Sequence, residues 1–348
     1  MRHPTAEDEP QVTLVISTDP PKARPAALHR AMTIAQAFAR IAGGCLDHVI
    51  AAAAYAQGSN DPEGVHQARV AIRRLRAAFS VFRPVLPRRK PAIIRRLRML
   101  QRRLGATREL DVLIEETIAS MPMRSRMGRG MRDLLRLTQN RRDGSRRRAR
   151  TALSSAQCVA LRSELAPSID RYLAMGLASR ATATRLGEPI EVFAADVLGR
   201  RWRKVKGLGA RLGELDEIGL HALRIEVKKL RYAAEFFRDL WPQERTQRYL
   251  ALLKSLQQLL GTAHDAAVAV TLIADLGKQG GTHAERAASL VQSWAKACFG
   301  RDRRNLTAQW QRCAKVNGFW EAPRGHWKRP IRHTPELAGS ARFTPHAL

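Results

Sequence analysis

The amino-acid sequence predicts an all-α protein, and three observations support this fold class. Apolar residues recur at three- and four-residue steps from about residue 26 to residue 315, which is the period of amphipathic helices. Strong helix formers, chiefly alanine, leucine, arginine and glutamate, dominate the same stretch. The alternation of apolar and polar residues that is typical of strands is essentially absent. The chain has 348 residues, 45% of them hydrophobic, and can therefore bury a sizeable core.

Four segments are predicted along the chain. Residues 1–25 are acidic and contain several prolines, so we expect a disordered tail or the stub of a linker. Residues 26–187 and 188–316 are expected to form a first and a second helical bundle. Residues 317–348 are polar, basic and rich in proline, which predicts a poorly ordered tail.

Glycine residues punctuate the helical pattern and predict some of the helix ends. Gly105 and Gly261 are expected to stop two helices at corresponding places in the two bundles. Thr107 and Thr262 follow them and are expected to cap the next helices. The amino ends of such helices would favour an anion.

An internal repeat supports the division into two bundles. Residues 65–76 read VHQARVAIRRLR and residues 220–231 read LHALRIEVKKLR, an offset of 221 − 66 = 155. A second block follows each copy: residues 104–109 read LGATRE and residues 260–265 read LGTAHD, at an offset of 156. A repeat of this length is too long for a solenoid unit. It predicts two tandem four-helix bundles that are related by a pseudo-twofold axis.

A helical wheel separates each copy of the motif into two faces. One face is apolar and is predicted to be buried; it holds Ala68, Ile72, Leu75, Phe79, Phe82 and Leu86 in the first copy, and Leu223, Val227, Leu230, Phe237 and Trp241 in the second. The other face is a basic stripe of His66, Arg69, Arg73 and Arg76, matched by His221, Arg224, Lys228 and Arg231.

The basic stripes are unfavourable for an isolated helix. Like charges at these spacings destabilise a helix by a few tenths of a kcal/mol per pair. Because both copies keep the stripe, with a histidine at the same place, we expect an anion to offset the repulsion. Arg95, Arg98 and Arg102 form a further basic face before Gly105, and Lys254 matches Arg98 in the second copy.

The overall charge also indicates a polyanionic partner. Lys and Arg number 61 against 31 Asp and Glu, a net charge of +30, so nucleic acid, an anionic membrane surface and a phosphate polymer are the candidate partners. We see no apolar stretch of 18 residues and expect no membrane span. The four cysteines lack CxxC spacing, which favours a reducing cytoplasm and argues against a zinc site.

The duplicated motif H-x-x-R-[VI]-x-[VI]-[RK]-[RK]-L-R, each copy followed by an L-G block, resembles the CHAD family of histidine-containing α-helical domains. The resemblance covers about residues 26–315 and implies two four-helix bundles about a basic cleft that binds inorganic polyphosphate. Glu109 stands where the family usually has Asp, and His264-Asp265 is a reduced form of the same element, which leaves the role of the Glu109–Asp111 turn open. The residues that it implies for binding are His66, Arg69, Arg73, Arg74, Arg76, His221, Arg224, Lys228, Lys229, Arg231 and Tyr232, supported by Arg98, Arg102 and Lys254.

We therefore expect a non-catalytic protein that binds polyphosphate in the cytoplasm or on polyphosphate granules, without a cofactor or a metal. Whether it stores, localises or regulates the polymer stays open, as do its oligomeric state and the preferred chain length. The alternative is a nucleic-acid-binding protein, since residues 141–150 hold the densest arginine run. Asp111, Glu115 and Glu116 could hold a metal, but salt bridges to the many arginines are favoured.

Overall fold

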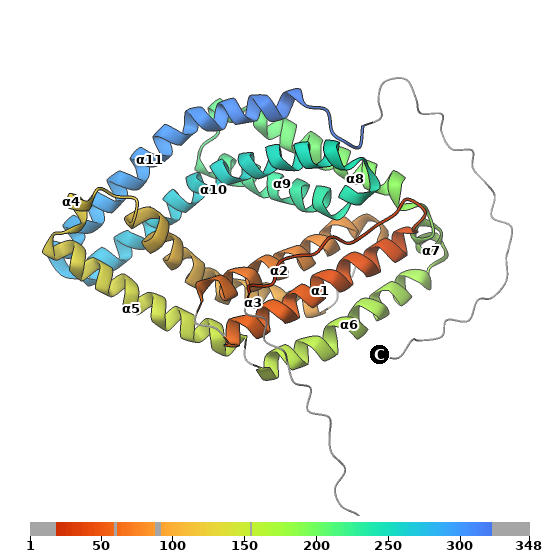
Figure 1. Cartoon of the computed structure of the whole chain (residues 1–348), viewed down its shortest axis with the longest axis horizontal. Coiled ribbons are helices and arrows are strands. Elements are labelled where there is room, and N and C mark those ends of the chain that lie inside the picture. Colours follow the sequence, from red (N-terminus) through yellow and green to blue (C-terminus); the bar gives the residue numbers. More distant parts are fainter. Residues whose placement is uncertain (1–18, 59–60, 88–91, 154, 322–348) are drawn as a thin grey trace, which may run out of the picture.

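The computed structural model describes residues 19–58, 61–87, 92–153 and 155–321 (Figure 1). These residues are almost entirely helical. Their β pairing is confined to an isolated bridge between Thr33 and Pro189. The prediction of an all-α fold is thus confirmed. Most of the predicted N-terminal tail, and the C-terminal tail from residue 322, lie outside the described residues.

The two predicted segments contain different numbers of helices. The first contains α1 (Ile34–Gly58), α2 (Pro62–Val81), α3 (Ala92–Val112), a π-helical turn (Leu113–Ile118), α4 (Met123–Arg126), α5 (Arg129–Ala152), α6 (Ser155–Leu177) and α7 (Arg180–Leu186). The second contains α8 (Ile190–Gly209), α9 (Glu217–Phe236), α10 (Gln243–Gln279) and α11 (Gly281–Lys315). Short 3₁₀ turns follow α2, α8 and α9, at Arg83–Val85, Leu212–Glu214 and Arg238–Leu240.

Helices α2 and α9 carry the two copies of the motif, and their limits differ by the repeat offset of 155. Asp61 and Asp216 cap them, each carboxylate accepting a backbone N–H at 2.8 Å, from Glu63 and Gly219 respectively. The corresponding caps explain why the two helices begin at matching places. The arrangement as two separate bundles about a pseudo-twofold axis stays a prediction.

The expectation that Gly105 and Gly261 end helices is wrong. Helix α3 continues through Gly105, and α10 continues through Gly261. One glycine costs a helix only about 1 kcal/mol, and apolar residues on both sides of each glycine, such as Leu104 and Leu110 around Gly105, are buried. Tertiary packing therefore outweighs the local preference.

The two threonines do not cap helices either. Thr107 is fully buried within α3, and its hydroxyl pairs with that of Ser145 of α5 at 2.9 Å. Thr262 donates from its hydroxyl to the carbonyl of Leu259 within α10.

The main hydrophobic core joins helices from both predicted segments. Phe82, at the end of α2, lies 5.2 Å from Phe38 of α1, 5.2 Å from Phe193 of α8 and 5.9 Å from Phe237 at the end of α9, measured between ring centroids. Both predicted buried faces are confirmed, with Trp241 partly buried. The second segment also reaches past residue 316, since Phe319 and Trp320 are buried against Tyr249.

A second, smaller core lies at the end of the molecule where α5, α10 and α11 meet (Figure 1). Its buried residues include Leu113 of the π-helical turn, Leu134 of α5, Ile273 of α10 and Val291 of α11. Helices α10 and α11 reverse direction at Gly281, whose φ of 75° favours glycine. The two segments are therefore joined at both ends of the molecule.

Two of the described helices, α1 and α10, are long and apolar enough to cross a membrane by length and composition alone. Core helices of proteins that never enter a bilayer meet the same criterion, so this is weak evidence for a span. The apolar stretch of α1 is 56% buried inside the protein, and that of α10 is 22% buried. The sequence prediction of no membrane span is consistent with this packing in α1.

Candidate anion-binding site

Helices α2 and α9 pack against each other, and this contact brings the two basic stripes together. Arg73 of α2 lies close enough to Arg224 and Lys228 of α9 for the charges to repel, and Arg69 similarly affects Lys228. We call Arg69, Arg73, Arg224 and Lys228 the cationic cluster. Two of its members come from each copy of the repeated motif, as the sequence predicted.

Burial and mutual repulsion lower the pKa values of cations in the cluster. Burial, followed by the nearby charges of Arg224 and Arg73, lowers the pKa of Lys228 to about 7, against the opposing effect of Asp265. Burial and Arg73 also lower the pKa of Arg69, to about 10. Positive charge at this place is thus costly in the free protein, and a bound anion would reduce the cost.

Two carboxylates border the cluster without neutralising it. Asp265 of α10 lies 3.8 Å from Arg224, between Oδ1 and Nη2, and Glu109 of α3 interacts electrostatically with Arg69. Burial raises the pKa of each carboxyl group, and this effect is larger than the opposing effect of the neighbouring arginine. Both acids belong to the second repeated block.

Several polar atoms of the site are buried without a partner among the described residues. They are Nε of Arg73, Nε of Arg224 and Nδ1 of His66. A buried donor that makes no hydrogen bond costs about 1–3 kcal/mol. Unpaired atoms in a native structure call for an explanation, and an anion that accepts from the two guanidinium groups provides one for the arginines.

The two predicted histidines have different surroundings. His66 is half-buried, and burial lowers its pKa, with Arg108, Arg73 and Arg69 acting in the same direction and Glu63 against them. His221 is exposed, and its Nδ1 lies 3.2 Å from Nδ1 of His264. Burial, followed by the charges of Arg224, His221 and Lys228, lowers the pKa of His264 to about 4.

Three of the predicted binding residues are engaged in internal contacts instead. Arg74 and Arg231 both form ion pairs with Glu235. The guanidinium of Arg231 also lies over the ring of Tyr232, 4.8 Å from its centroid, and Tyr232 itself is buried. Arg74 follows Arg73 by about 100° on the helix, so it faces a different side of α2. The Arg74–Glu235 pair joins α2 to α9, whereas these contacts of Arg231 lie within α9. All three residues lie outside the cationic cluster.

Some of the remaining predicted residues continue the basic stripes, and others lie away from them. Arg76 donates to Gln101 of α3, and its pKa is lowered by burial and by Arg98 and Arg102, so these arginines continue the stripe of α2. Lys254 is exposed on α10. Lys229 faces away from the cluster, and its Nζ lies 2.6 Å from Oε1 of Glu226.

Four residues of the site were not predicted to bind. Arg108, Glu109, His264 and Asp265 surround the cluster from α3 and α10. The sequence held a signal for them, because all four lie in the second repeated block. Interpreting Gly105 and Gly261 as helix stops separated that block from the stripes.

The acidic residues after Gly105 form salt bridges, as expected. Asp111 is almost fully buried and accepts from Nε of Arg142 at 2.7 Å and from Arg146 at 2.9 Å; Arg142 also pairs with Glu115. Arg108 pairs with Glu116 at 2.6 Å. In the part of the chain that the structure describes, no group of three or more potential metal ligands occurs.

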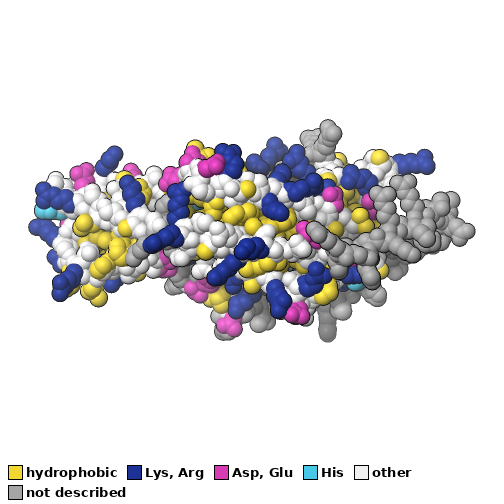
Figure 2. Space-filling model, turned by 90° about the horizontal axis from the view of Figure 1, so that it is seen from above, with side chains coloured by type: hydrophobic (Ala, Val, Ile, Leu, Met, Phe, Trp, Pro, Cys, Tyr) yellow, Lys and Arg dark blue, Asp and Glu magenta, His cyan; other side chains and the backbone are white. Residues whose placement is uncertain are grey.

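The arginines of residues 141–150 are less accessible to a ligand than those of a fully solvated helix face would be. Arg142 and Arg146 are used internally, and Arg141 pairs with Asp275 at 2.5 Å. Arg147 and Arg148 remain exposed. Other Lys and Arg side chains are scattered over the face drawn in Figure 2, interspersed with acidic ones. The cationic cluster differs from this scattered charge because it is partly buried and crosses two helices.

The fold and the site define a class: all-helical proteins in which two copies of a basic motif meet to form one basic surface. The family model of the CHAD domain matches residues 40–274, and the chain belongs to this family. The chain is similar to the crystal structure of the CHAD domain from the plant Ricinus communis, at 27% identity and a TM-score of 0.75, over 87% of this chain and 99% of that one. PptA from Streptomyces chartreusis shares the fold at 15% identity and a TM-score of 0.57, over 80% of this chain and 100% of that one. No curated protein matches the chain.

Proposed function

We propose that this protein binds inorganic polyphosphate at the cationic cluster, without chemically changing it. The observation that carries the proposal is the meeting of Arg69 and Arg73 with Arg224 and Lys228, with unpaired Nε atoms on two of them. A phosphate polymer carries about one negative charge per unit and has no base to stack or read. It requires closely spaced cations and donors, which this cluster offers.

Arginine suits this task because its planar guanidinium donates two parallel hydrogen bonds to phosphate oxygens. Displacement of counterions from the polymer makes such binding steeply dependent on salt. Membership of the CHAD family supports the same ligand class through the resemblance described above. Storage, localisation or regulation of polyphosphate in the cytoplasm are the roles that we propose for this binding.

The test compares two charge reversals of equal size. Arg73→Glu with Lys228→Glu changes the cationic cluster, and Arg147→Glu with Arg148→Glu changes two exposed arginines of α5. We expect polyphosphate affinity at about 0.15 M salt to fall at least tenfold in the first variant and less than about threefold in the second. Equal losses in both variants would mean that diffuse charge, and no defined site, binds the polymer.

Nucleic acid is the competing ligand in the same experiment. Polyphosphate should displace duplex DNA and single-stranded RNA at comparable phosphate concentration. DNA that binds equally well or more tightly at this salt concentration would overturn the assignment to polyphosphate. Incubation with ATP or triphosphate should yield no phosphate, and steady release of phosphate would contradict a non-catalytic role.

A further inference from the structure

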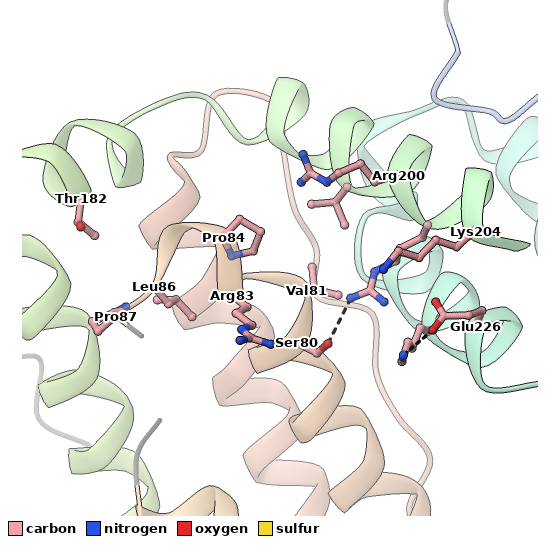
Figure 3. Close-up of a pocket in the computed structure, with 13 residues that line it drawn as sticks. Ser80, Val81, Arg83, Pro84, Leu86, Pro87, Thr182, Arg200, Lys204 and Glu226 are labelled. Atoms are coloured by element: carbon pink, nitrogen blue, oxygen red, sulfur yellow. Dashed lines mark hydrogen bonds and ion pairs between the residues drawn. The ribbon is translucent and has the colours of Figure 1, made fainter. Parts of the chain in front are cut away.

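A second basic region lies in a cavity of about 880 Å³ between α8, α9, α7 and the turn that follows α2 (Figure 3). Cations from three places line it: Arg83 after α2, Arg200, Arg201 and Lys204 of α8, and Lys229 of α9. Glu226 is the one acidic residue among the described lining residues, and it pairs with Lys229. The cavity therefore has a strong excess of positive charge.

The cavity has an apolar wall as well as a basic one. Val81, Pro84, Leu86 and Pro87 come from the end of α2 and the following turn. Figure 3 shows Pro84 and Leu86 on one side, with Arg200 and Lys204 on the α8 side. A volume in this range, with apolar and polar walls together, is typical of sites for small organic ligands.

The cations of the basic wall form few hydrogen bonds and salt bridges within the protein. Within the described part of the chain, neither Arg83 nor Lys204 forms a salt bridge. Arg201 makes a long 3.4 Å hydrogen bond to the hydroxyl of Ser80 and interacts electrostatically with Glu226. Arg200 pairs with Asp196, yet its side chain is still 42% exposed. Arg83 and Lys204 are therefore available to a bound anion, and Arg200 is exposed enough to contact it as well.

We propose that this cavity binds a small phosphorylated organic molecule of the nucleotide type. Its phosphates would contact Arg200, Lys204 and Arg83, and its organic part would cover the apolar wall. A bare phosphate polymer has no apolar surface to place against Pro84 and Pro87, the more exposed residues of this wall, so the second wall favours a ligand with an organic group.

The cavity and the cationic cluster can be changed separately. Both use α9, but Lys229 and Glu226 line the cavity, while Arg224 and Lys228 belong to the cluster. Successive residues of a helix point about 100° apart, so the two sets occupy different faces. This proposal does not depend on polyphosphate binding at the cluster.

The test uses calorimetric titration of the full chain with ATP, without magnesium, and with tripolyphosphate. Arg200→Gln with Lys204→Gln changes the cavity, and both side chains are exposed enough for the fold to tolerate the change, which thermal melting will verify. Arg147→Gln with Arg148→Gln is the matched neutralisation elsewhere. We expect the cavity variant to bind ATP at least tenfold more weakly than wild type and the matched variant to stay within about threefold.

Two further outcomes decide the site and the ligand class. In the cluster variant Arg73→Glu with Lys228→Glu, ATP binding should persist within about threefold, and ATP should bind more tightly than tripolyphosphate. Loss of ATP binding in the cluster variant, with retention in the cavity variant, would overturn the proposal and leave polyphosphate binding untouched. Tripolyphosphate that binds the cluster variant as tightly as ATP would overturn the role of the apolar wall.

Discussion

The two copies of the basic motif have the same helix limits but different partners. In the first copy, Arg69 donates to the carbonyls of Leu104 and Gly105 in α3, at 2.9 and 2.6 Å. In the second copy, Arg224 faces the carboxylate of Asp265 in α10 and retains an unpaired Nε. The repeated sequence sets which face of the helix is basic, whereas the neighbouring helix decides what holds each arginine.

A second difference concerns how each neighbouring helix is anchored. Helix α3 is tied to α5 by the buried ion pair of Asp111 with Arg142. At the corresponding place in α10, 111 + 156 = 267, the residue is alanine. Helix α10 is held against α11 by apolar residues such as Ala269 and Ile273 instead. The first copy should therefore be the one that depends on electrostatics for its shape.

The largest expected effect is on stability and comes from Arg142→Ala. The substitution leaves the buried carboxylate of Asp111 with Arg146 as its remaining partner and removes the partner of Glu115. Breaking one side of a buried ion pair costs about 3–5 kcal/mol. Urea denaturation should show this loss in the free energy of unfolding. Arg147→Ala is the matched exposed control, and a similar small effect of both changes would contradict the anchoring of α3 by charge.

The next effect is a dependence of stability on pH that arises from Lys228. An unfolded lysine keeps its proton up to about pH 10.5, while burial and the arginines lower the pKa of folded Lys228 to about 7. Between these values the unfolded chain binds more protons, so stability rises with pH by up to about 1.4 kcal/mol per pH unit.

Replacing this lysine with an uncharged residue should remove that slope. Lys228→Met is expected to flatten the free energy of unfolding between about pH 7 and pH 10, measured by denaturation at a series of pH values. Arg147→Met, which changes an exposed arginine of α5, is the control and should leave the slope unchanged. An unchanged slope in Lys228→Met would mean that Lys228 keeps its charge in the folded protein.

A smaller effect, on the pH dependence of polyphosphate affinity, should differ between His66 and His221. Burial and the neighbouring arginines lower the pKa of His66, so the free protein resists protonating it, and a bound polyanion would favour the proton. Polyphosphate binding should therefore take up protons and become tighter as pH falls from about 8 to 6. Lys228, whose pKa is lowered to about 7, should add to the same uptake, so the share of each histidine is measured in a Lys228→Met background.

Substitution of each histidine measures its share of this effect. His66→Gln should lose more of the pH dependence than His221→Gln, because His66 is the half-buried ring. Affinity can be followed by titration in buffers of different ionisation enthalpy. Wild-type affinity that stays flat across this range would show that the histidines act in neutral form. Loss of binding at every pH in the double variant would give them a structural role.

The smallest expected effect is a gain in stability that should be the same in the two copies of the repeat. Gly105→Ala and Gly261→Ala should each stabilise the protein by about 0.5–1 kcal/mol, since both glycines lie inside helices. A methyl group at Gly261 meets no atom within 4 Å, and at Gly105 the nearest atom is 3.8 Å away. Thermal melting would detect the gain. A loss at Gly105 alone would show that Arg69 needs the bare backbone there.

The sequence predicted the helical class, the buried faces and the four cations of the cluster, because all three follow from helical periodicity within one segment. It failed at Gly105 and Gly261, where packing by distant residues outweighs a local preference. It also could not place Arg74, since its partner Glu235 becomes available only once α2 and α9 pack together. The pair of Arg231 with Glu235, by contrast, spans four residues of α9 and was open to prediction from the spacing. Arg74 was predicted to bind from the family resemblance alone, since it does not lie on the basic stripe of α2.

The closure of the molecule by a second core, where α5 meets α10 and α11, has a consequence for the ligand. Because the two segments are joined at both ends, they cannot swing apart about a single hinge to relieve the repulsion between Arg73 and Lys228. The spacing of the charges is fixed during folding, so it is already present when a ligand arrives. Most of the conformational entropy lost on binding is then lost by the ligand. A polyphosphate that is already short or stiff should therefore bind more tightly per phosphate than a long, flexible one.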